Sequence, residues 1–449
     1  MAQNISIRKI FFLLILTCGP AAWGMPADQA ATAWARVPGI LANIKPPKFP
    51  DREFPVTRYG AVGDGVTDCT GAFRKAIDEC NRAGGGIVEV TGGTFLTGAI
   101  HLKSNVDLRV EKGATIRFSP DPAHYLPVVF ARYEGTEVMN YSPLIYAFEQ
   151  TNIAISGEGT LDGQGTSWHS WKSSDDPRRL VQAASSGVPP GQRIFGAGHH
   201  LRPNFVVPLG CRNVLIEDVH IINSPMWVLN PVFCTNVTVR DVTVDTKGPN
   251  TDGCDPDSCT GVLIRNCNFS DGDDCIAIKS GRDRDGQKIN IPSRDIIIQN
   301  CIFQAGHGGI GIGSETSGGV RNVFAEHCHF DSPDLEMAIR LKTNPARGGY
   351  IRDVYVRDCD VKQAQIGIDM TLRYGSSGAI DGEAIPVIRD IDIRNTTFQH
   401  LTRQPVFIQG WSESAPISDV SIIDCRFLHA AKSNYVTNAT DIVMDGSRF

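Results

Sequence analysis

Four short fragments in the second half of the chain carry side chains that could act together on one chemical bond. They are Asn250-Thr-Asp252-Gly, Gly-Asp273-Asp274-Cys, Gly-His307-Gly and Arg340-Leu-Lys342. Hydrolysis of a glycosidic bond needs one carboxyl group that protonates the leaving oxygen and one carboxylate that directs water or attacks the sugar. An arginine beside a lysine offers a bidentate partner and a point charge for a sugar carboxylate. Together the fragments predict cleavage of a glycosidic bond next to an acidic sugar.

Each fragment alone is weak evidence for catalysis. Asp-Asp and Asn-Thr-Asp-Gly are common turn sequences, Gly-His-Gly is typical of a flexible loop, and Arg-x-Lys is typical of an exposed strand. Crowding of Asp252, Asp273 and Asp274 would raise the pKa of at least one carboxyl and keep an acid protonated near neutral pH. His307 could then hydrogen-bond that carboxyl or a sugar hydroxyl. The prediction therefore depends on the elements that carry the fragments.

A repeated unit supplies those elements. Two short alternating apolar runs recur in eight copies, which begin at Val214, Val237, Val262, Ile296, Val323, Val354, Ile391 and Val420. The copies start 23 to 37 residues apart, and Asn or Asp recurs at the break between the runs, as a corner requires. A strand-rich repeat of this length without helical periodicity predicts an all-β parallel β-helix, a solenoid whose stacked turns share one core.

The repeat register brings the fragments together. It aligns Asp252 with Asp273 once four extra residues are allowed before Asp252, and it aligns Asp273 with His307. These three side chains should form one ladder on successive turns, with backbones about 4.8 Å apart. On the next turn, strand alternation sends Arg340 and Lys342 out of the core together.

Five of the 13 cysteines also follow the repeat. One column, which also accepts Val and Thr, contains Cys267, Cys301, Cys328, Cys359 and Cys425. Such a column predicts buried free thiols that behave as small apolar side chains. Disulfides among the remaining Cys211, Cys234, Cys254 and Cys259 stay open at this stage.

The N-terminus has a different organisation. Residues 1–24 combine a short basic region, an apolar run and small residues, which predicts a secretory signal peptide and a secreted or periplasmic protein. Residues 25–449 should form one β-helix domain, with its N-terminal cap and first turns at about 50–120. Residues 67–83 have helical periodicity, and such a helix could cap the first turn. No later stretch is apolar enough to span a membrane.

The net charge and the loop composition limit which partners the protein is expected to bind. A net charge of −6 argues against nucleic acid, so an acidic polysaccharide would need a local basic patch. Three stretches, 121–142, 163–203 and 281–294, should be surface loops. The second carries residues that could either wall off a subsite or belong to an ordinary loop: Trp168, Trp171, Arg178, Arg179, Arg193, His199, His200 and Arg202. The nearby acids Asp255, Asp257, Asp271, Asp283 and Asp285 are interpreted as corner or loop residues, with Ca²⁺ binding as a weaker alternative.

The four fragments, in this order and spacing, resemble the signature of glycoside hydrolase family 28, the polygalacturonases. Arg58–Gly65 and Gly84–Val90 resemble the start of pectin-degrading β-helices, and Gly313–Val323 resembles bacterial members. The resemblance implies a right-handed parallel β-helix and inverting hydrolysis of α-1,4-linked galacturonate, without a metal or other cofactor. It also implies an acidic polysaccharide as substrate; we expect a monomer.

The resemblance also implies a role for each site residue. Asp273 would be the general acid, and Asp252 and Asp274 would hold and activate the water. His307 would tune the acid and assist binding. The remaining residues would bind or support the substrate, namely Asn250, Arg340, Lys342 and Tyr374, of which Tyr374 is the nearest candidate for a tyrosine from a later turn.

Several alternatives remain at this stage. A pectate lyase on a similar scaffold would need a strong base and usually Ca²⁺, and a non-catalytic β-helix such as an adhesin would have no reason to align these residues. Hydrolases of rhamnogalacturonan typically depart from the Gly-His-Gly fragment, so the intact fragment favours galacturonan. The bacterial resemblance favours exo over endo action.

Overall fold

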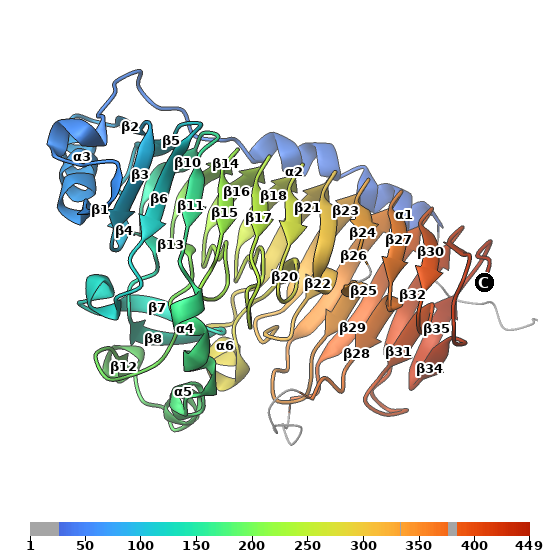
Figure 1. The fold of residues 1–449 in the computed structure, drawn as a ribbon. Helices are drawn as coiled ribbons and strands as arrows, with labels where there is room; N and C mark the ends of the chain where they lie inside the picture. Colours follow the sequence, from blue (N-terminus) through green and yellow to red (C-terminus); the bar gives the residue numbers. More distant parts are fainter. Residues whose placement is uncertain (1–26, 333, 376–383) are drawn as a thin grey trace, which may run out of the picture.

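The computed structural model describes residues 27–332, 334–375 and 384–449, and these form an elongated parallel β-helix (Figure 1). The predicted all-β solenoid is confirmed. The predicted signal peptide, residues 1–24, lies outside the described residues. Among the described residues, no helix is both long enough and apolar enough to cross a lipid bilayer.

One face of the solenoid is a twelve-stranded parallel sheet. Its strands, in spatial order, are β2 (Gly86–Val90), β5 (Val106–Val110), β10 (Thr151–Ser156), β14 (Arg212–Glu217), β16 (Thr235–Arg240), β18 (Thr260–Arg265), β21 (Ser293–Gln299), β23 (Val320–Glu326), β26 (Tyr350–Arg357), β29 (Val387–Arg394), β32 (Ile417–Ile423) and β35 (Ala439–Val443). The first run of each of the eight predicted copies lies in β14 and the seven strands that follow it in chain order within this sheet, so the sequence repeat corresponds to one turn of the solenoid.

The second run of each copy belongs to a second face, reached after a tight corner. This face contains β1 (Asp64–Asp68), β3 (Gly93–Thr97), β6 (Ala114–Phe118), β11 (Thr160–Asp162), β15 (His220–Ile222), β17 (Thr243–Asp245), β19 (Asn268–Ser270), the start of β22 (Ile302–Ile312), β24 (His329–Asp331), β27 (Asp360–Ala364), β30 (Thr397–Leu401) and β33 (Arg426–Phe427). The corners have positive φ angles of 49° to 64° at Asp218, Asp241, Asn266, Asn300, His327, Asp358, Asn395 and Asp424. Asn and Asp tolerate this left-handed conformation better than most residues, which explains their recurrence at the break.

A third face carries the functional fragments. It contains β4 (Ile100–His101), β9 (Ile145–Phe148), β13 (Val206–Leu209), β20 (Ile276–Ile278), the end of β22, β25 (Leu335–Lys342), β28 (Ile366–Thr371), β31 (Val406–Gln409) and β34 (Tyr435–Thr437). Ile276 pairs with Ile310, and Ile310 pairs with Ile339. This row points into the core, so its neighbours Lys279, Arg340 and Lys342 belong to the outer side of the strands.

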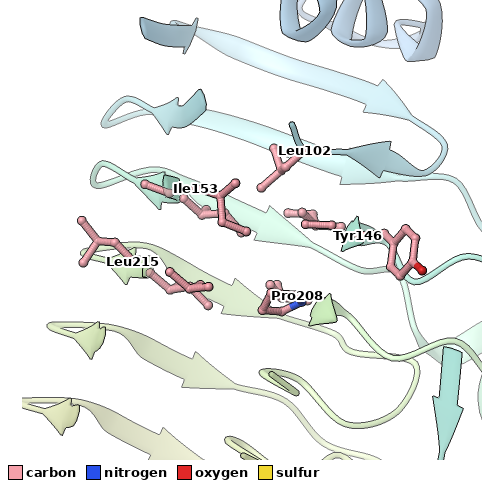
Figure 2. Close-up of a pocket in the computed structure, with 12 residues that line it drawn as sticks. Leu102, Tyr146, Ile153, Pro208 and Leu215 are labelled. Carbon is pink, nitrogen blue, oxygen red and sulfur yellow. The ribbon is translucent and has the colours of Figure 1, made fainter. Parts of the chain in front are cut away.

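The core is one continuous apolar stack. The predicted cysteine column is confirmed, because all twelve cysteines of the described residues are buried and free. The open question about disulfides is thus answered for Cys211, Cys234, Cys254 and Cys259, which form none. Figure 2 shows the close packing of turns around Leu102, Ile153 and Pro208, where the remaining space is only about 10 Å³. A space of that size accepts at most one water, so it is a packing gap and not a binding site.

Helices cover the N-terminal end and one side of the solenoid (Figure 1). Helix α3 (Thr70–Arg82) confirms the helix predicted at 67–83, and it buries Phe73, Ala76 and Ile77 against the first turns. Helices α1 (Ala27–Trp34) and α2 (Val37–Asn43) run along the outer surface of the twelve-stranded sheet, where their apolar residues pack on Leu263, Ile297, Phe324 and Tyr355. We call residues 27–45 the N-terminal strap.

The three stretches predicted as surface loops are more ordered than expected. They contain the antiparallel hairpin β7 (Val129–Tyr133) and β8 (Thr136–Asn140), short β12 (Ile194–Phe195), and helices α4 (Thr166–His169), α5 (Asp176–Ser185) and α6 (Asp283–Ile289). They also contain the 3₁₀ segments Pro122–Tyr125, Ser170–Ser173 and Pro190–Gln192, whereas the 3₁₀ segment Val56–Tyr59 lies nearer the N-terminus. Val138, Leu180, Phe195 and Trp227 form a small separate core. The loop prediction was wrong because these stretches bury their few apolar residues against one another. We call this unit the side lobe (Figure 1).

Candidate active site

The three predicted carboxylates converge on the third face. One oxygen from each of Asp252, Asp273 and Asp274 lies within 4.8 Å of the other two. Asp252 and Asp274 are buried, whereas Asp273 is partly exposed and faces a cavity of about 420 Å³. The convergence of residues from two successive turns was predicted from the repeat register.

The register itself differs by one residue from the prediction. Cys254 forms a bridge with Ile276, which makes Asp252 level with Asp274 and not with Asp273. The irregular segment before Asp252 takes up one residue fewer than the predicted alignment allowed. Asp273 and His307 lie on successive turns as predicted, and the His307 amide donates to the Asp273 carbonyl at 2.9 Å.

Asp274 is held by two cations. Arg340 Nη1 donates to Oδ1 at 3.2 Å, and Lys342 Nζ donates to Oδ2 at 2.5 Å. All three side chains are buried. Gly308 makes room for this group, since a Cβ atom there would lie 2.8 Å from Asp274 Oδ1 and 3.3 Å from Arg340 Cδ. The Arg-Leu-Lys fragment therefore fixes a carboxylate of the protein, and it also lines the cavity.

Asp273 and His307 form the accessible acid–base pair of the site. His307 Nδ1 lies 3.1 Å from Asp273 Oδ1, and the imidazole is about half exposed. Burial disfavours the charged form of Asp273, but the hydrogen bond with His307 and the Lys342 charge outweigh it and lower the pKa of Asp273 to about 2. The same hydrogen bond raises the pKa of His307 above its ordinary value.

Asp252 has the opposite electrostatic environment. Burial and the charge of Asp273 raise its pKa well above the ordinary value, while the Lys279 charge opposes this shift. The crowding prediction is thus correct in kind, but in the ligand-free protein the raised pKa belongs to Asp252 and not to the exposed Asp273.

Lys279 is a site residue that the sequence did not reveal. Its ammonium lies 3.6 Å from Asp252 Oδ2, 3.6 Å from Asp255 Oδ1 and 3.3 Å from Glu315 Oε2. It also lies 4.3 Å from the centroid of the Trp227 ring. A signal was present, because Lys279 follows the inward residues Ile276 and Ile278 on the same strand side as Arg340 and Lys342.

Asn250 and Tyr374 line the cavity as predicted. Asn250 adopts a left-handed φ of 56°, and its Oδ1 accepts a hydrogen bond from Arg202 Nη2 at 2.8 Å. Tyr374 lies with its ring centroid 5.0 Å from Lys342 Nζ and 5.5 Å from Arg340 Cζ. A later turn thus supplies an aromatic ring beside the two cations.

The nearby acids are not all corner or loop residues. Asp255, Asp257 and Asp271 are buried, which corrects that interpretation. Asp257 pairs with Arg132 Nη1 at 2.7 Å, a partner from the side lobe that no local pattern could identify. On the other hand, Asp283 and Asp285 do lie in an insertion, where they pair with Arg347 and Arg193.

Most residues proposed for a wall at 163–203 have structural roles instead. Trp168 is buried against Tyr125, and Arg193 is buried against Asp285. Four further residues of that set form ion pairs with Asp175 or Asp176: Arg178, Arg179, His199 and His200. Of that set only Arg202 lines the cavity, where it is joined by Tyr133, Glu134, Lys172 and Pro177.

The side lobe closes one side of the cavity. Glu134, at the tip of the β7–β8 hairpin, accepts a hydrogen bond from Arg282 at 2.7 Å, and both residues line the cavity. Arg202 reaches from the lobe to the backbone carbonyls of Pro225 and Pro249 and to Asn250. The lobe is therefore attached directly to the segment that carries Asp252.

Three carboxylate oxygens this close are a donor set that a divalent cation could use. Two of the three residues are already engaged, because Lys342 and Arg340 take both oxygens of Asp274 and His307 takes Asp273 Oδ1. The protein's own cations therefore neutralise the cluster, and the arrangement suits acid–base chemistry better than metal binding.

Comparison with known proteins gives a consistent result. Residues 191–444 match the family model of glycosyl hydrolases family 28. A solved structure of a hyperthermoactive exopolygalacturonase from Thermotoga maritima has a TM-score of 0.87 and 41% identity, over 93% of this chain and 97% of that one. A probable polygalacturonase of Vitis vinifera is 31% identical over 86% of this chain and 76% of its own length. An endo-polygalacturonase of Pectobacterium carotovorum is 28% identical over 78% of this chain and 81% of its own length.

Proposed function

This chain belongs to glycosyl hydrolases family 28, and from that premise we propose that it hydrolyses α-1,4 bonds between galacturonate units of polygalacturonan. The observation that carries the proposal is the cluster of Asp252, Asp273 and Asp274 beside a cavity lined with cations. Arg340 and Lys342 add positive charge where the carboxylate of an acidic sugar would lie. The net charge of −6 makes this local patch necessary.

In the proposed mechanism Asp273 is the general acid, since it is the carboxyl that faces the cavity and contacts His307. Asp252 and Asp274 hold and orient the attacking water. In the free protein the raised pKa of Asp252 favours its protonated form, and the lowered pKa of Asp273 favours its ionised form. We propose that the proton moves from Asp252 to Asp273 when substrate and water bind. This transfer makes both a donor for the glycosidic oxygen and a base for the water.

The remaining residues bind substrate in this proposal. Arg340, Lys342 and Tyr374 hold the galacturonate unit beside the scissile bond, and Asn250 supports the segment that carries Asp252. His307 tunes Asp273 and contacts a sugar hydroxyl. No cofactor takes part.

Inversion at the anomeric carbon is the finer part of the mechanism. It rests on family membership, because the short oxygen distances alone would favour retention, for which carboxyl groups typically lie about 5–5.5 Å apart. Proton NMR of the first product tests this directly. A β-anomer released from the α-linked polymer supports inversion, and an α-anomer refutes it.

We propose exo action because the side lobe closes the cavity on one side. Glu134 and Arg282 are paired on that side and would occupy the space that a further galacturonate unit needs. The solved relative named exopolygalacturonase is also more similar than the relative named endo-polygalacturonase, at 41% against 28% identity. A product time course decides between them: monomer or dimer from the start supports exo action, and a ladder of intermediate oligomers supports endo action.

The catalytic proposal is tested by Asp273→Asn. The kcat on polygalacturonate should fall about 10²- to 10⁴-fold, as expected for loss of a general acid. Asp245→Asn, which changes an exposed strand residue, should leave kcat unchanged. Retention of activity in Asp273→Asn would refute the proposal. A rise in ultraviolet absorbance during turnover would indicate an unsaturated product and a lyase instead.

A further inference from the structure

Lys279 occupies an unusual position beside the site. It directly follows β20, on the same outward side as Ala277, and its buried side chain lines the cavity. Its ammonium lies within 3.6 Å of three carboxylates, those of Asp252, Asp255 and Glu315. A buried cation with three acidic neighbours is not needed to hold the solenoid together, since an apolar side chain would pack on Trp227 without the cost of desolvating a charge.

The carboxylates around Lys279 differ in their other partners. Glu315 is held by Ser314 and Arg347 as well as by Lys279. Neither oxygen of Asp255 accepts a hydrogen bond from the described residues, and burial raises its pKa well above the ordinary value. Asp252 Oδ1 likewise accepts no hydrogen bond within the described part of the chain. The ionic state of Asp252 therefore depends on its burial and on neighbouring charges more than on hydrogen bonds.

Several charged groups face Asp252. They are Asp255 on its own segment, Asp271, Asp273 and Asp274 on the next turn, Lys279 just after β20, and Lys342 on β25. The acidic neighbours all favour a proton on Asp252, and Lys279 is the nearest cation that opposes them. Lys342 is the other opposing cation, but its ammonium donates a hydrogen bond to Asp274 Oδ2 at 2.5 Å. By contrast, Asp273 already has His307 as a partner.

We propose that Lys279 is a positioning residue whose charge drives the shared proton from Asp252 to Asp273, so that Asp252 becomes the base for the attacking water. Glu315 competes with Asp252 for the Lys279 charge and so sets its strength. This inference rests on the proposed hydrolysis. In it, one buried cation determines that Asp273 is the protonated acid and Asp252 the ionised base. Lys279 acts through Asp252 and does not itself hold the sugar.

The test compares variants by their pH profiles. In Lys279→Met the acidic limb of kcat/KM should move to higher pH by about one unit or more, because Asp252 loses its nearest opposing cation. In Glu315→Gln the limb should move to lower pH, because the full Lys279 charge then acts on Asp252. Lys279→Arg should keep the limb near its original position. Lys288→Met, an exposed lysine on α6, is the matched control and should move nothing.

Opposite movements in the two variants support the proposal, and a merely structural role would not produce them. An unmoved limb in Lys279→Met, or a rise in KM alone, would overturn it, the latter because it would make Lys279 a substrate ligand. If Lys279→Met does not fold, the double variant Lys279→Met/Glu315→Gln removes one charge of each sign and should still move the limb upward.

A second measurement needs no substrate. Titration of the ¹³C carboxyl signal of Asp252 in aspartate-labelled protein, assigned with Asp252→Asn, should move upward by about one pH unit or more in Lys279→Met. This measurement separates the two proposals. If polygalacturonate is not hydrolysed but the Asp252 signal moves, the proposed function fails while the coupling stands. If the signal does not move, the coupling fails whatever the activity.

Discussion

Replacement of Gly308 by alanine should impair catalysis although it changes none of the catalytic side chains. The new Cβ would lie 2.8 Å from Asp274 Oδ1, whereas ordinary contacts begin at 3.4 Å, so the carboxylate must retreat by about 0.6 Å. Asp274 cannot move freely, since Arg340 and Lys342 hold its two oxygens at 3.2 and 2.5 Å. The displacement would pass to the water that Asp274 is proposed to hold.

The expected size follows from this geometry. A misplacement of about 1 Å can reduce a rate about 100-fold, so about 0.6 Å should reduce kcat about 10- to 100-fold, or about 1.4–2.7 kcal/mol in activation free energy. Overpacking should also lower the free energy of unfolding by about 1–3 kcal/mol. Release of reducing ends from polygalacturonate gives kcat and KM, and thermal unfolding gives the loss of stability.

The matched control is Gly71→Ala in α3. A Cβ there meets no heavy atom within 4 Å, and alanine in a helix should raise the free energy of unfolding by about 0.5–1 kcal/mol with kcat unchanged. If Gly308→Ala keeps kcat within twofold of the parent protein, Asp274 is not tightly placed and its role as water holder is wrong.

Five further outcomes are expected. In Asp273→Asn the pKa of His307, measured by NMR of the ring, should fall toward its ordinary value, because the hydrogen bond to a carboxylate raises it. In the parent protein, the Asp273–His307 pair should stabilise the fold most at pH values between the ordinary aspartate pKa and the ordinary histidine pKa. Because the pKa of His307 is raised, the stabilisation by His307 is lost as pH rises through that pKa. Because the pKa of Asp273 is lowered, the stabilisation by Asp273 is lost as pH falls toward about 2. Arg202→Met should lower the free energy of unfolding by about 2–5 kcal/mol and lower kcat, since it frees Asn250 and buried carbonyl groups, and an unchanged melting temperature would contradict this role. Trp34→Ala in the N-terminal strap should lower the free energy of unfolding by about 3–5 kcal/mol, because Trp34 packs on the twelve-stranded sheet. At low temperature kcat should stay unchanged, because the strap lies away from the cavity. A large loss of kcat would contradict this independence of the strap and the active site. A thiol reagent should react slowly with the native protein, because its cysteines are buried. After unfolding in denaturant it should react with all twelve cysteines of the described residues, and fewer reactive thiols would indicate disulfides.

The repeat made most of the fold predictable. A turn of the solenoid leaves two periodic signals in the sequence, apolar alternation in the strands and Asn or Asp at the corner, and both follow from local backbone geometry. A second asparagine ladder was missed, in which Asn213 donates to Asn152 at 2.8 Å and Asn236 donates to Asn213 at 2.7 Å. Asn213 and Asn236 directly precede the first apolar run of their copies, where the strand pattern has not yet begun.

The site was predictable in its membership and less so in its electrostatics. Residue type and turn order were enough to bring Asp252, Asp273 and His307 together. Burial was not predictable in the same way, since aspartate is normally a surface residue. Asp257 is buried because Arg132 reaches it from a hairpin 125 positions earlier in the chain. Contacts of that kind depend on how the side lobe folds back, and no repeat encodes them.

The glycines of β22 explain how distant turns can share one charge cluster. Asp274 and the pair Arg340 and Lys342 belong to turns separated by the turn of β22, so their backbones lie about 9.6 Å apart. Gly311 pairs with Arg340 in the register, and a Cβ at Gly311 would lie 3.7 Å from Asp274 Oδ2. The intervening turn thus offers backbone and little side-chain volume, and the long cations cross it to reach the carboxylate. The Gly-His-Gly fragment therefore belongs to a strand and not to a flexible loop, and the absence of side chains at its glycines is what lets His307 contact one aspartate while Arg340 contacts the next.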